Sequence, residues 1–579
     1  MSSIANFDTV SKASDYRTNG TATLRWVALV LPAIVTLVLA LTFRQGMRAT
    51  DDLGYAALAT SAIGGHPIPD REAAHHAARV GVILPLAGIF ALVGPSNTSI
   101  AFVPLLCTIL TASLIAWLAS YFWGPAVGLA AGLVFSLIPI MINTATFYVP
   151  EPLLDFELCA AAALFLAARA RSDRLAGQMQ FLAGVLVGVA YLTTEVGALM
   201  LPAFYLYLAV GKKLRARDWW LMAGFLFVFG GELAYNAAAH GNALYRFALT
   251  SGYTNDPMVQ DANVDLKYRL LKSYPAEFIY PHLSLGLMGP VLIAAGAYGV
   301  VKFREAGFFV IWAALILLFY NFMTASFTHY VALPVSLRLV MPACLALSVL
   351  AGKMLVDLSR WTFARSSPTG RYVLAGLSAT AAAVVVAVSA LSMLLGTGAS
   401  FTATVARNAE ATAEHLSMYP AVTVVSDRYS SRAIQFYRGF NPRDSFVALS
   451  AVAENRVARS PAFVVLNGAV INEGRISGGL YGAGFLPSQE RAALDRVLPP
   501  GDTAVFSSLF HGGYPSTLLD YAVVRQLLGP YNYRQARMLQ ATSPPLAQVV
   551  VFRYDRIADR RGHALVHASD LHASAGVDQ

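Results

Sequence analysis

Long apolar runs separated by short polar segments fill the first two thirds of the chain. An α-helix needs roughly 20 residues to cross a bilayer, and these runs approach that length. The first run is not followed by a small-residue cleavage site, so we interpret it as a retained signal anchor. We predict about eleven spans, near 25–43, 98–122, 125–147, 152–170, 178–194, 196–210, 218–238, 284–301, 306–326, 337–358 and 372–395.

Lysine and arginine gather in alternate connections between the predicted spans. Short cytoplasmic loops are enriched in these residues, so we place the basic connections and the N-terminal segment 1–24 in the cytoplasm. The same alternation puts the long loops 44–97 and 239–283 outside. The basic connections are 169–174, 212–217, 302–305 and 360–371.

The segment 78–94 is apolar enough to suggest a further span, but the alternation leaves both of its ends outside. It contains Pro85 and is short for a span. We predict that it lies in the outer interface or re-enters the membrane. The alternative is that it does span, and that another predicted helix is misplaced.

The pattern changes from about residue 400. Four segments rich in β-branched and aromatic residues predict strands, and two segments between them predict helices. The strands are 421–429, 461–471, 502–510 and 547–555, and the helices are 430–438 and 487–498. This alternation indicates an external α/β domain over 399–556, followed by a polar mobile tail, 557–579.

Composition excludes several classes of protein. The 579 residues are 56% hydrophobic and 13% charged, about half the charged fraction of a soluble domain. The net charge of +9 does not indicate a nucleic-acid partner, because membrane topology already explains the basic loops. Cys107, Cys159 and Cys344 fall within apolar runs, which indicates buried side chains and neither disulfides nor a metal site.

Four acids lie within or beside the predicted spans: Glu151, Asp155, Glu195 and Glu232. By the predicted topology each lies near the external end of its helix. An ionisable group in hydrocarbon costs about 2.5–3.5 kcal/mol, so it normally faces a polar cavity or a partner. Acids from separate helices on one side therefore predict a polar pocket open to the outer leaflet.

Two adjacent acids, Asp51 and Asp52, follow the first predicted span in the stretch TDDLGYAALATSAIGGHP. They either cap the helix that starts at Leu53 or serve as the working carboxylates of a site. Spacing alone leaves both interpretations open. The same side offers the cations Arg79, Lys267 and Arg338, and the further pocket candidates Tyr55, His66, His75, His76 and His329.

Carboxylates and cations at the outer leaflet suit a lipid-phosphate substrate. A carboxylate can take a proton from an acceptor hydroxyl as general base, and Arg or Lys can stabilise the charge on a leaving phosphate. Asp51 and Asp52 could instead hold a divalent cation, Mg²⁺, Mn²⁺ or Ca²⁺. The sequence contains neither a Walker-type phosphate loop nor a His-Glu-x-x-His zinc motif.

The order of these features resembles the polytopic GT-C glycosyltransferases, in particular the bacterial relatives of protein mannosyltransferases and lipid A aminoarabinose transferases. The resemblance covers roughly residues 25–350. The motifs that carry it are TDDLGY (50–55), HP (66–67), FALVGPS (90–96), ASYFWGPAVGLAAGLVFSLIP (119–139), EPLLDFELCAAAALFLAARAR (151–171), AGVLVGVAYLTTEVGALMLP (183–202) and SLRLVMPACLAL (336–347).

The resemblance implies that Asp51 or Asp52 is the catalytic or metal-binding acid of the first external loop, and that an interfacial helix follows this loop. Asp155 corresponds to an acid often found in the second external loop of relatives. Many relatives carry a lysine where this chain has Thr194. If that lysine handles the donor phosphate, Arg338, Arg79 or Lys267 must replace it here.

The predicted fold is an α-helical polytopic membrane protein with a GT-C-like catalytic domain over 25–398, an interfacial helix and a C-terminal extracytoplasmic α/β domain. The predicted function is transfer of a hexosyl or pentosyl group from a polyprenyl-phosphate sugar to a lipid or glycan acceptor. The predicted location of the protein is the bacterial inner membrane, where it contacts membrane lipids, and the predicted reaction takes place at the outer face. The alternative is a transporter or flippase of a lipid-linked or anionic substrate, which would show midplane charges and internal repeats.

Overall fold

The computed structural model describes residues 22–64, 74–251, 267, 269–280, 283–324, 329–333, 336–398, 401–448, 462–467, 506–509, 522, 524–527 and 548–553. The chain forms two compact units. The first contains residues 1–45, 69–86 and 101–397, and the second contains 46–68, 87–100 and 398–579. Helices α5 (Val80–Val93) and α6 (Asn97–Trp123) contribute to both units.

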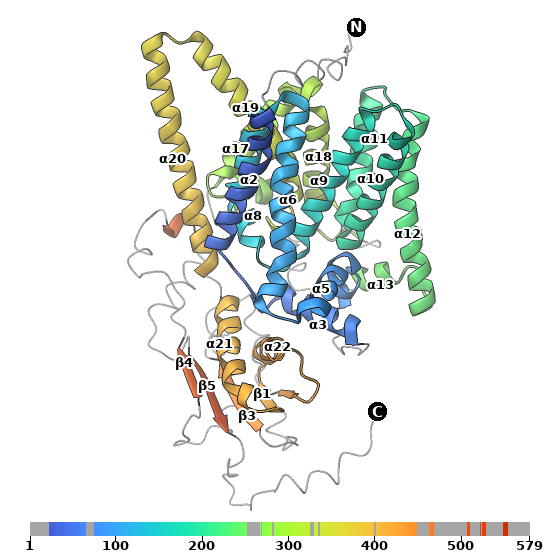
Figure 1. Ribbon diagram of the computed structural model, residues 1–579, viewed down its shortest axis with the longest axis vertical. Helices are drawn as coiled ribbons and strands as arrows, with labels where there is room; N and C mark the ends of the chain where they lie inside the picture. The colour runs from blue at the N-terminus through green and yellow to red at the C-terminus, as the bar shows by residue number, and fades with distance from the viewer. Residues whose placement is uncertain are drawn as a thin grey trace, which may run out of the picture. The chain divides into compact units, whose positions relative to one another are not determined.

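The first unit is a bundle of apolar helices (Figure 1). Among the described residues, seven helices are long and apolar enough to cross a membrane. The polytopic character predicted from the sequence is thereby confirmed, while the exact number of spans stays a prediction. The main helices of this unit, besides the shared α5 and α6, are α2 (Ala22–Thr42), α7 (Pro125–Ser136), α9 (Pro150–Arg169), α10 (Arg174–Thr193), α11 (Met200–Val210), α12 (Trp219–His240), α17 (Met288–Val301), α18 (Phe303–Phe322), α19 (Met341–Arg365) and α20 (Pro368–Gly398).

Two predicted spans are interrupted in the structure. The predicted helix 125–147 is divided at Leu137 and Ile138 into α7 and α8 (Pro139–Thr144), because a proline ring disfavours helical backbone at the residue before it. The predicted helix 196–210 begins with the 3₁₀ turn Glu195–Leu199 before α11. The segment predicted to lie in the interface forms the short helix α5, which contains Pro85.

Small residues bring the helices of the bundle into close contact. Helices α10 and α12 lie side by side (Figure 1), and a Cβ added at Gly184 would lie 1.9 Å from the carbonyl oxygen of Leu221. A Cβ at Gly224 would lie 2.0 Å from that of Phe181. Close backbone packing of this kind replaces the hydrophobic driving force that is missing within a bilayer, and it fixes the helix ends that carry the polar residues.

The second unit contains helix α3 (Asp51–Gly64) and a C-terminal α/β fold. Its five-stranded sheet has the order β2-β1-β3-β5-β4. Strand β1 pairs in parallel with β2 and β3, whereas β5 is antiparallel to β3 and β4. The strands are β1 (Thr423–Ser426), β2 (Ser445–Ala448), β3 (Ala462–Asn467), β4 (Phe506–Leu509) and β5 (Gln548–Arg553).

Helices α21 (Phe401–His415) and α22 (Arg428–Tyr437) contact this sheet (Figure 1). Each of the four predicted strand segments contains one of the observed strands, and α22 coincides with a predicted helix. Strand β2 was not predicted. The predicted helix 487–498 and the tail 557–579 lie outside the described residues.

Candidate functional site

The first predicted acid of the bundle, Glu151, forms an ion pair with a predicted cation. Glu151 lies in the first turn of α9, directly after Pro150, which favours the first turn of a helix. Arg338 lies in the turn that precedes α19, and its Nε is 3.1 Å from Oε1 of Glu151. The Glu151 side chain is 7% exposed and that of Arg338 is 30% exposed, so the pair keeps one partner accessible.

One helical turn after Glu151, a second carboxylate is buried without a counter-charge. Asp155 is 2% exposed, and its Oδ1 has no hydrogen-bond partner within the described part of the chain. The next acid, Glu157, accepts a hydrogen bond from Thr193 of α10 at 3.1 Å. Because a buried carboxylate normally has a partner, the Asp155 oxygen indicates a place where a ligand group or a proton is held.

A fully buried arginine, Arg246, joins the two remaining predicted acids. It lies in α13 (Tyr245–Ser251), after the end of α12. Its Nε donates to Oε1 of Glu195 at 3.0 Å, and its Nη1 is 3.3 Å from Oε1 of Glu232. Its remaining donors reach the carbonyl oxygens of Ala78 and Tyr191, both at 2.8 Å.

Arg246 therefore fastens the ends of α10 and α12 to the segment that leads into α5. It also stacks on the ring of Tyr191, with 4.6 Å between the guanidinium carbon and the ring centroid. Two carboxylates, two carbonyls and an aromatic face use most of its five N–H donors. This saturation indicates a positioning role and leaves little capacity for a substrate.

Tyr320, at the end of α18, connects the two ion-pair groups. The charges of both Glu151 and Glu195 act on its hydroxyl. The charge of Arg79 acts on both Tyr320 and Glu195. The structure thus brings most of the predicted residues of the bundle together at one end of its helices. We call this set the arginine–carboxylate cluster: Arg79, Glu151, Asp155, Glu195, Glu232, Arg246, Tyr320 and Arg338.

Asp52 belongs to the second unit, where it organises the start of α3. Its Oδ2 accepts the N–H of Arg48 at 2.6 Å, and its Oδ1 accepts those of Thr50 at 2.7 Å and Leu53 at 3.0 Å. The side chain is fully buried. Burial raises the pKa of Asp52 to about 6, against the lowering effect of these hydrogen bonds. These contacts hold the turn that leads into α3, which begins at Asp51 and not at the predicted Leu53.

Asp51 differs from its neighbour because its side chain is partly exposed. The turn before it contains Ala49 with φ +56°, a left-handed conformation that is unfavourable for a residue with a Cβ. Backbone strain of this kind concentrates at functional sites. Tyr55, one turn further, is fully buried in the second unit.

The other predicted residues lie apart from the cluster or outside the described chain. Lys267 and His329 are exposed, and His76 is buried beside Arg79, whose N–H donates to its carbonyl oxygen at 3.0 Å. His66 lies outside the described residues, as does the side chain of His75. No ion pair joins Lys267 to the cluster within the described residues.

The described residues contain no group of three or more His, Cys, Asp or Glu side chains that could hold a metal ion. Both oxygens of Asp52 already accept backbone N–H groups. Oδ2 of Asp52 keeps a second lone pair beside the N–H of Arg48, so the metal-binding alternative for Asp51 and Asp52 stays a prediction.

A family comparison matches the middle of the bundle. Residues 82–234 match the family model described as dolichyl-phosphate-mannose-protein mannosyltransferase. The matched segment runs from α5 to α12 and contains Glu151, Asp155, Glu195 and Glu232. No curated protein sequence matches the chain.

Solved structures share the fold. The oligosaccharyltransferase of Archaeoglobus fulgidus, solved with Zn and sulfate, aligns with a TM-score of 0.50 at 13% identity, over 79% of this chain and 70% of that chain. ArnT of Cupriavidus metallidurans bound to undecaprenyl phosphate gives a TM-score of 0.49 at 15% identity, over 77% and 94%. At 13% identity the likeness to the oligosaccharyltransferase concerns the fold alone, and it confirms the predicted GT-C-like architecture.

Proposed function

We propose a specific reaction for this chain, which the family match and the fold indicate to be a GT-C class membrane glycosyltransferase. It transfers a glycosyl group from a polyprenyl-phosphate sugar to a hydroxyl of a lipid or glycan acceptor. The observation that carries the proposal is the Glu151–Arg338 ion pair, one helical turn from the Asp155 carboxylate, which has an oxygen without a hydrogen-bond partner among the described residues. Glu151 and Asp155 lie in the segment that matches the family model.

In the proposed reaction the acceptor oxygen attacks the anomeric carbon of the donor sugar. The bond between that carbon and the acceptor oxygen forms, while the bond to the phosphate oxygen breaks. Asp51 takes the proton of the acceptor hydroxyl, and the leaving group is the polyprenyl phosphate anion. We assign the base role to Asp51 because both oxygens of Asp52 are engaged by backbone N–H groups.

The arginine–carboxylate cluster is the proposed phosphate site. A guanidinium matches a phosphate with two parallel hydrogen bonds and stays charged at all relevant pH values. Arg338 is suited to this role because its side chain is 30% exposed beside Glu151. Arg246 is less suited because its donors are already used. Arg338 is thus our candidate for the role that the resemblance gives to a lysine at the position of Thr194.

A lipid-linked donor is supported by the family description, which names a dolichyl-phosphate sugar. The position of the buried carboxylates, at the ends of apolar helices, also supports a lipid-linked donor, since such a sugar reaches a protein from the bilayer. No step of the proposal is assigned to a metal ion, because the described residues do not offer a matching donor set.

The test is to incubate the purified protein with a panel of polyprenyl-phosphate sugars and lipid or glycan acceptors, with and without EDTA. Release of polyprenyl phosphate and appearance of the glycosylated acceptor would support the proposal. Tight binding of a donor without release, and its movement across a vesicle bilayer, would favour the transporter instead.

A further inference from the structure

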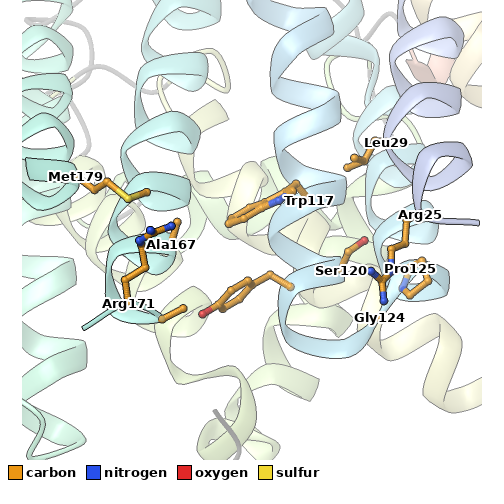
Figure 2. Close-up of a pocket in the computed structure, with 11 residues that line it drawn as sticks. Arg25, Leu29, Trp117, Ser120, Gly124, Pro125, Ala167, Arg171 and Met179 are labelled. Atoms are coloured by element: carbon orange, nitrogen blue, oxygen red, sulfur yellow. The ribbon is translucent and has the colours of Figure 1, made fainter. Parts of the chain in front are cut away.

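A cavity of about 550 Å³ opens between α2, α6, α7, α9 and α10, within the first unit (Figure 2). It lies at the end of α9 that is opposite to Glu151, because its wall includes Ala170 and Arg171 just after that helix ends. No residue of the arginine–carboxylate cluster lines it. This cavity is therefore distinct from the proposed catalytic site.

Two arginines stand on opposite sides of the cavity, with Trp117 between them (Figure 2). Arg25 of α2 makes no hydrogen bond or ion pair with any part of the chain that the structure describes. Arg171 pairs with Asp173 at 2.7 Å, but both side chains are about half exposed, so this pair contributes little.

A third arginine lies beside Arg171. Arg217 donates from Nη1 to the backbone carbonyl of Arg171 at 2.7 Å. Its Nε and Nη2 are buried and have no hydrogen-bond partner among the described residues. Asp173 pairs with Arg171, and Asp218 pairs with Arg169, so the region keeps unused guanidinium donors on Arg25 and Arg217 and a net positive charge.

Aromatic and aliphatic side chains form another part of the lining. Trp117 stacks on Tyr121, with 5.3 Å between ring centroids, and Leu29, Ala167 and Met179 also line the cavity. A lining that combines cationic groups with aromatic and aliphatic groups matches a molecule with a charged head and an apolar body. The volume also falls within the usual range for small-molecule sites.

We propose that this cavity binds the phosphate-bearing headgroup of an anionic phospholipid. Basic pockets between membrane helices on the cytoplasmic side bind such headgroups, and the predicted topology places this basic end of the bundle there. Arginines bind phosphate oxygens in a forked geometry that lysines lack. The cavity offers such a headgroup a cation on α2, Arg25, and a cation on the connection between α9 and α10, Arg171.

Native mass spectrometry of the purified full-length protein tests the proposal. The protein is titrated with phosphatidylglycerol and, separately, with phosphatidylcholine. The double variant Arg25→Gln/Arg171→Gln should bind phosphatidylglycerol about 30-fold more weakly, since each basic group near an anionic lipid contributes about a factor of five. Binding of phosphatidylcholine should not change.

The matched control is Lys302→Gln/Arg304→Gln, which removes two exposed charges, one just before α18 and one in its first turn. It should bind phosphatidylglycerol as wild type does. Equal phosphatidylglycerol binding by both double variants would overturn the proposal. The proposal would also be overturned if Arg25→Gln/Arg171→Gln lost binding of undecaprenyl phosphate and not of phosphatidylglycerol. It would equally be overturned if inorganic phosphate displaced bound phosphatidylglycerol as effectively as added phosphatidylglycerol does. These readouts need no turnover, so they are independent of the proposed reaction.

Discussion

Arg338 and Glu151 lie 3.1 Å apart although 187 positions separate them in the sequence. One belongs to the turn before α19 and the other to the first turn of α9. Their pairing brings two helix starts together at one end of the bundle. It also leaves the cation partly accessible, which is the property that the proposed phosphate role requires.

The first prediction concerns this pair. Arg338→Gln should lower kcat/KM about 100-fold, because removing one donor to a developing negative charge costs roughly that much. Arg338→Lys should retain more activity, since it keeps the charge but loses the fork. Steady-state kinetics with a lipid-linked donor would measure both. Equal activity of wild type and Arg338→Gln would contradict the phosphate role.

A second prediction concerns Arg246, which we assign to positioning. Arg246→Met should destabilise the bundle by about 3–5 kcal/mol, because Glu232 would remain buried without its cation. Thermal unfolding in detergent measures the effect. The double variant Arg246→Met/Glu232→Gln should recover part of the loss.

The matched control for Arg246 is Arg304→Met, at an exposed position, which should change stability by less than about 1 kcal/mol. An Arg246→Met protein as stable as this control would show that the buried network is not needed for the fold.

A third prediction follows from the buried carboxyl of Asp52. Its pKa is raised from 3.8 to about 6 by burial, so the folded loop favours the neutral acid. This stabilising contribution is complete below pH 3.8 and is lost as the pH rises through 6, which amounts to roughly 3 kcal/mol. Hydrogen exchange of residues 46–56, corrected for intrinsic rates, should show weaker protection at pH 7 than at pH 4.5.

Asp52→Asn should remove most of this pH dependence, because the amide does not titrate. Asp173→Asn, at an exposed carboxylate in the first unit, should leave it unchanged. Persistence of the full pH dependence in Asp52→Asn would assign it to another group.

A fourth prediction tests orientation. In a background without the three native cysteines, Arg443→Cys in the exposed turn before β2 should react with an impermeant thiol reagent in intact cells. Arg304→Cys, in a predicted cytoplasmic turn, should react only after lysis. The reverse pattern would invert the predicted topology and the side of the proposed reaction.

The sequence predicted the elements that a strong local pattern defines. Apolar runs located the helices. Glu151, Asp155 and Glu195 were predicted to line a polar site because an ionisable group in hydrocarbon needs a polar environment, and that role stays a prediction. Four strands were located because their segments are rich in β-branched and aromatic residues. The pairing of Glu151 with Arg338 could not be predicted, since it depends on how distant helices pack.

Arg246 was missed for the same reason. It lies in a short helix within a polar loop, and its contacts reach residues as distant in sequence as Ala78. The local sequence shows only a basic residue that follows the predicted span containing Glu232. The different surroundings of Asp51 and Asp52 were also hidden, because adjacent identical residues are distinguished only by the backbone that folds around them.

The most direct test of the proposed reaction compares wild type, Asp51→Asn and Asp52→Asn in release of polyprenyl phosphate from a lipid-linked sugar. The proposal predicts that Asp51→Asn folds normally and loses turnover, whereas Asp52→Asn alters the stability of the loop as well. Turnover by Asp51→Asn at the wild-type rate, with the same donor and acceptor, would contradict the assignment of the general base.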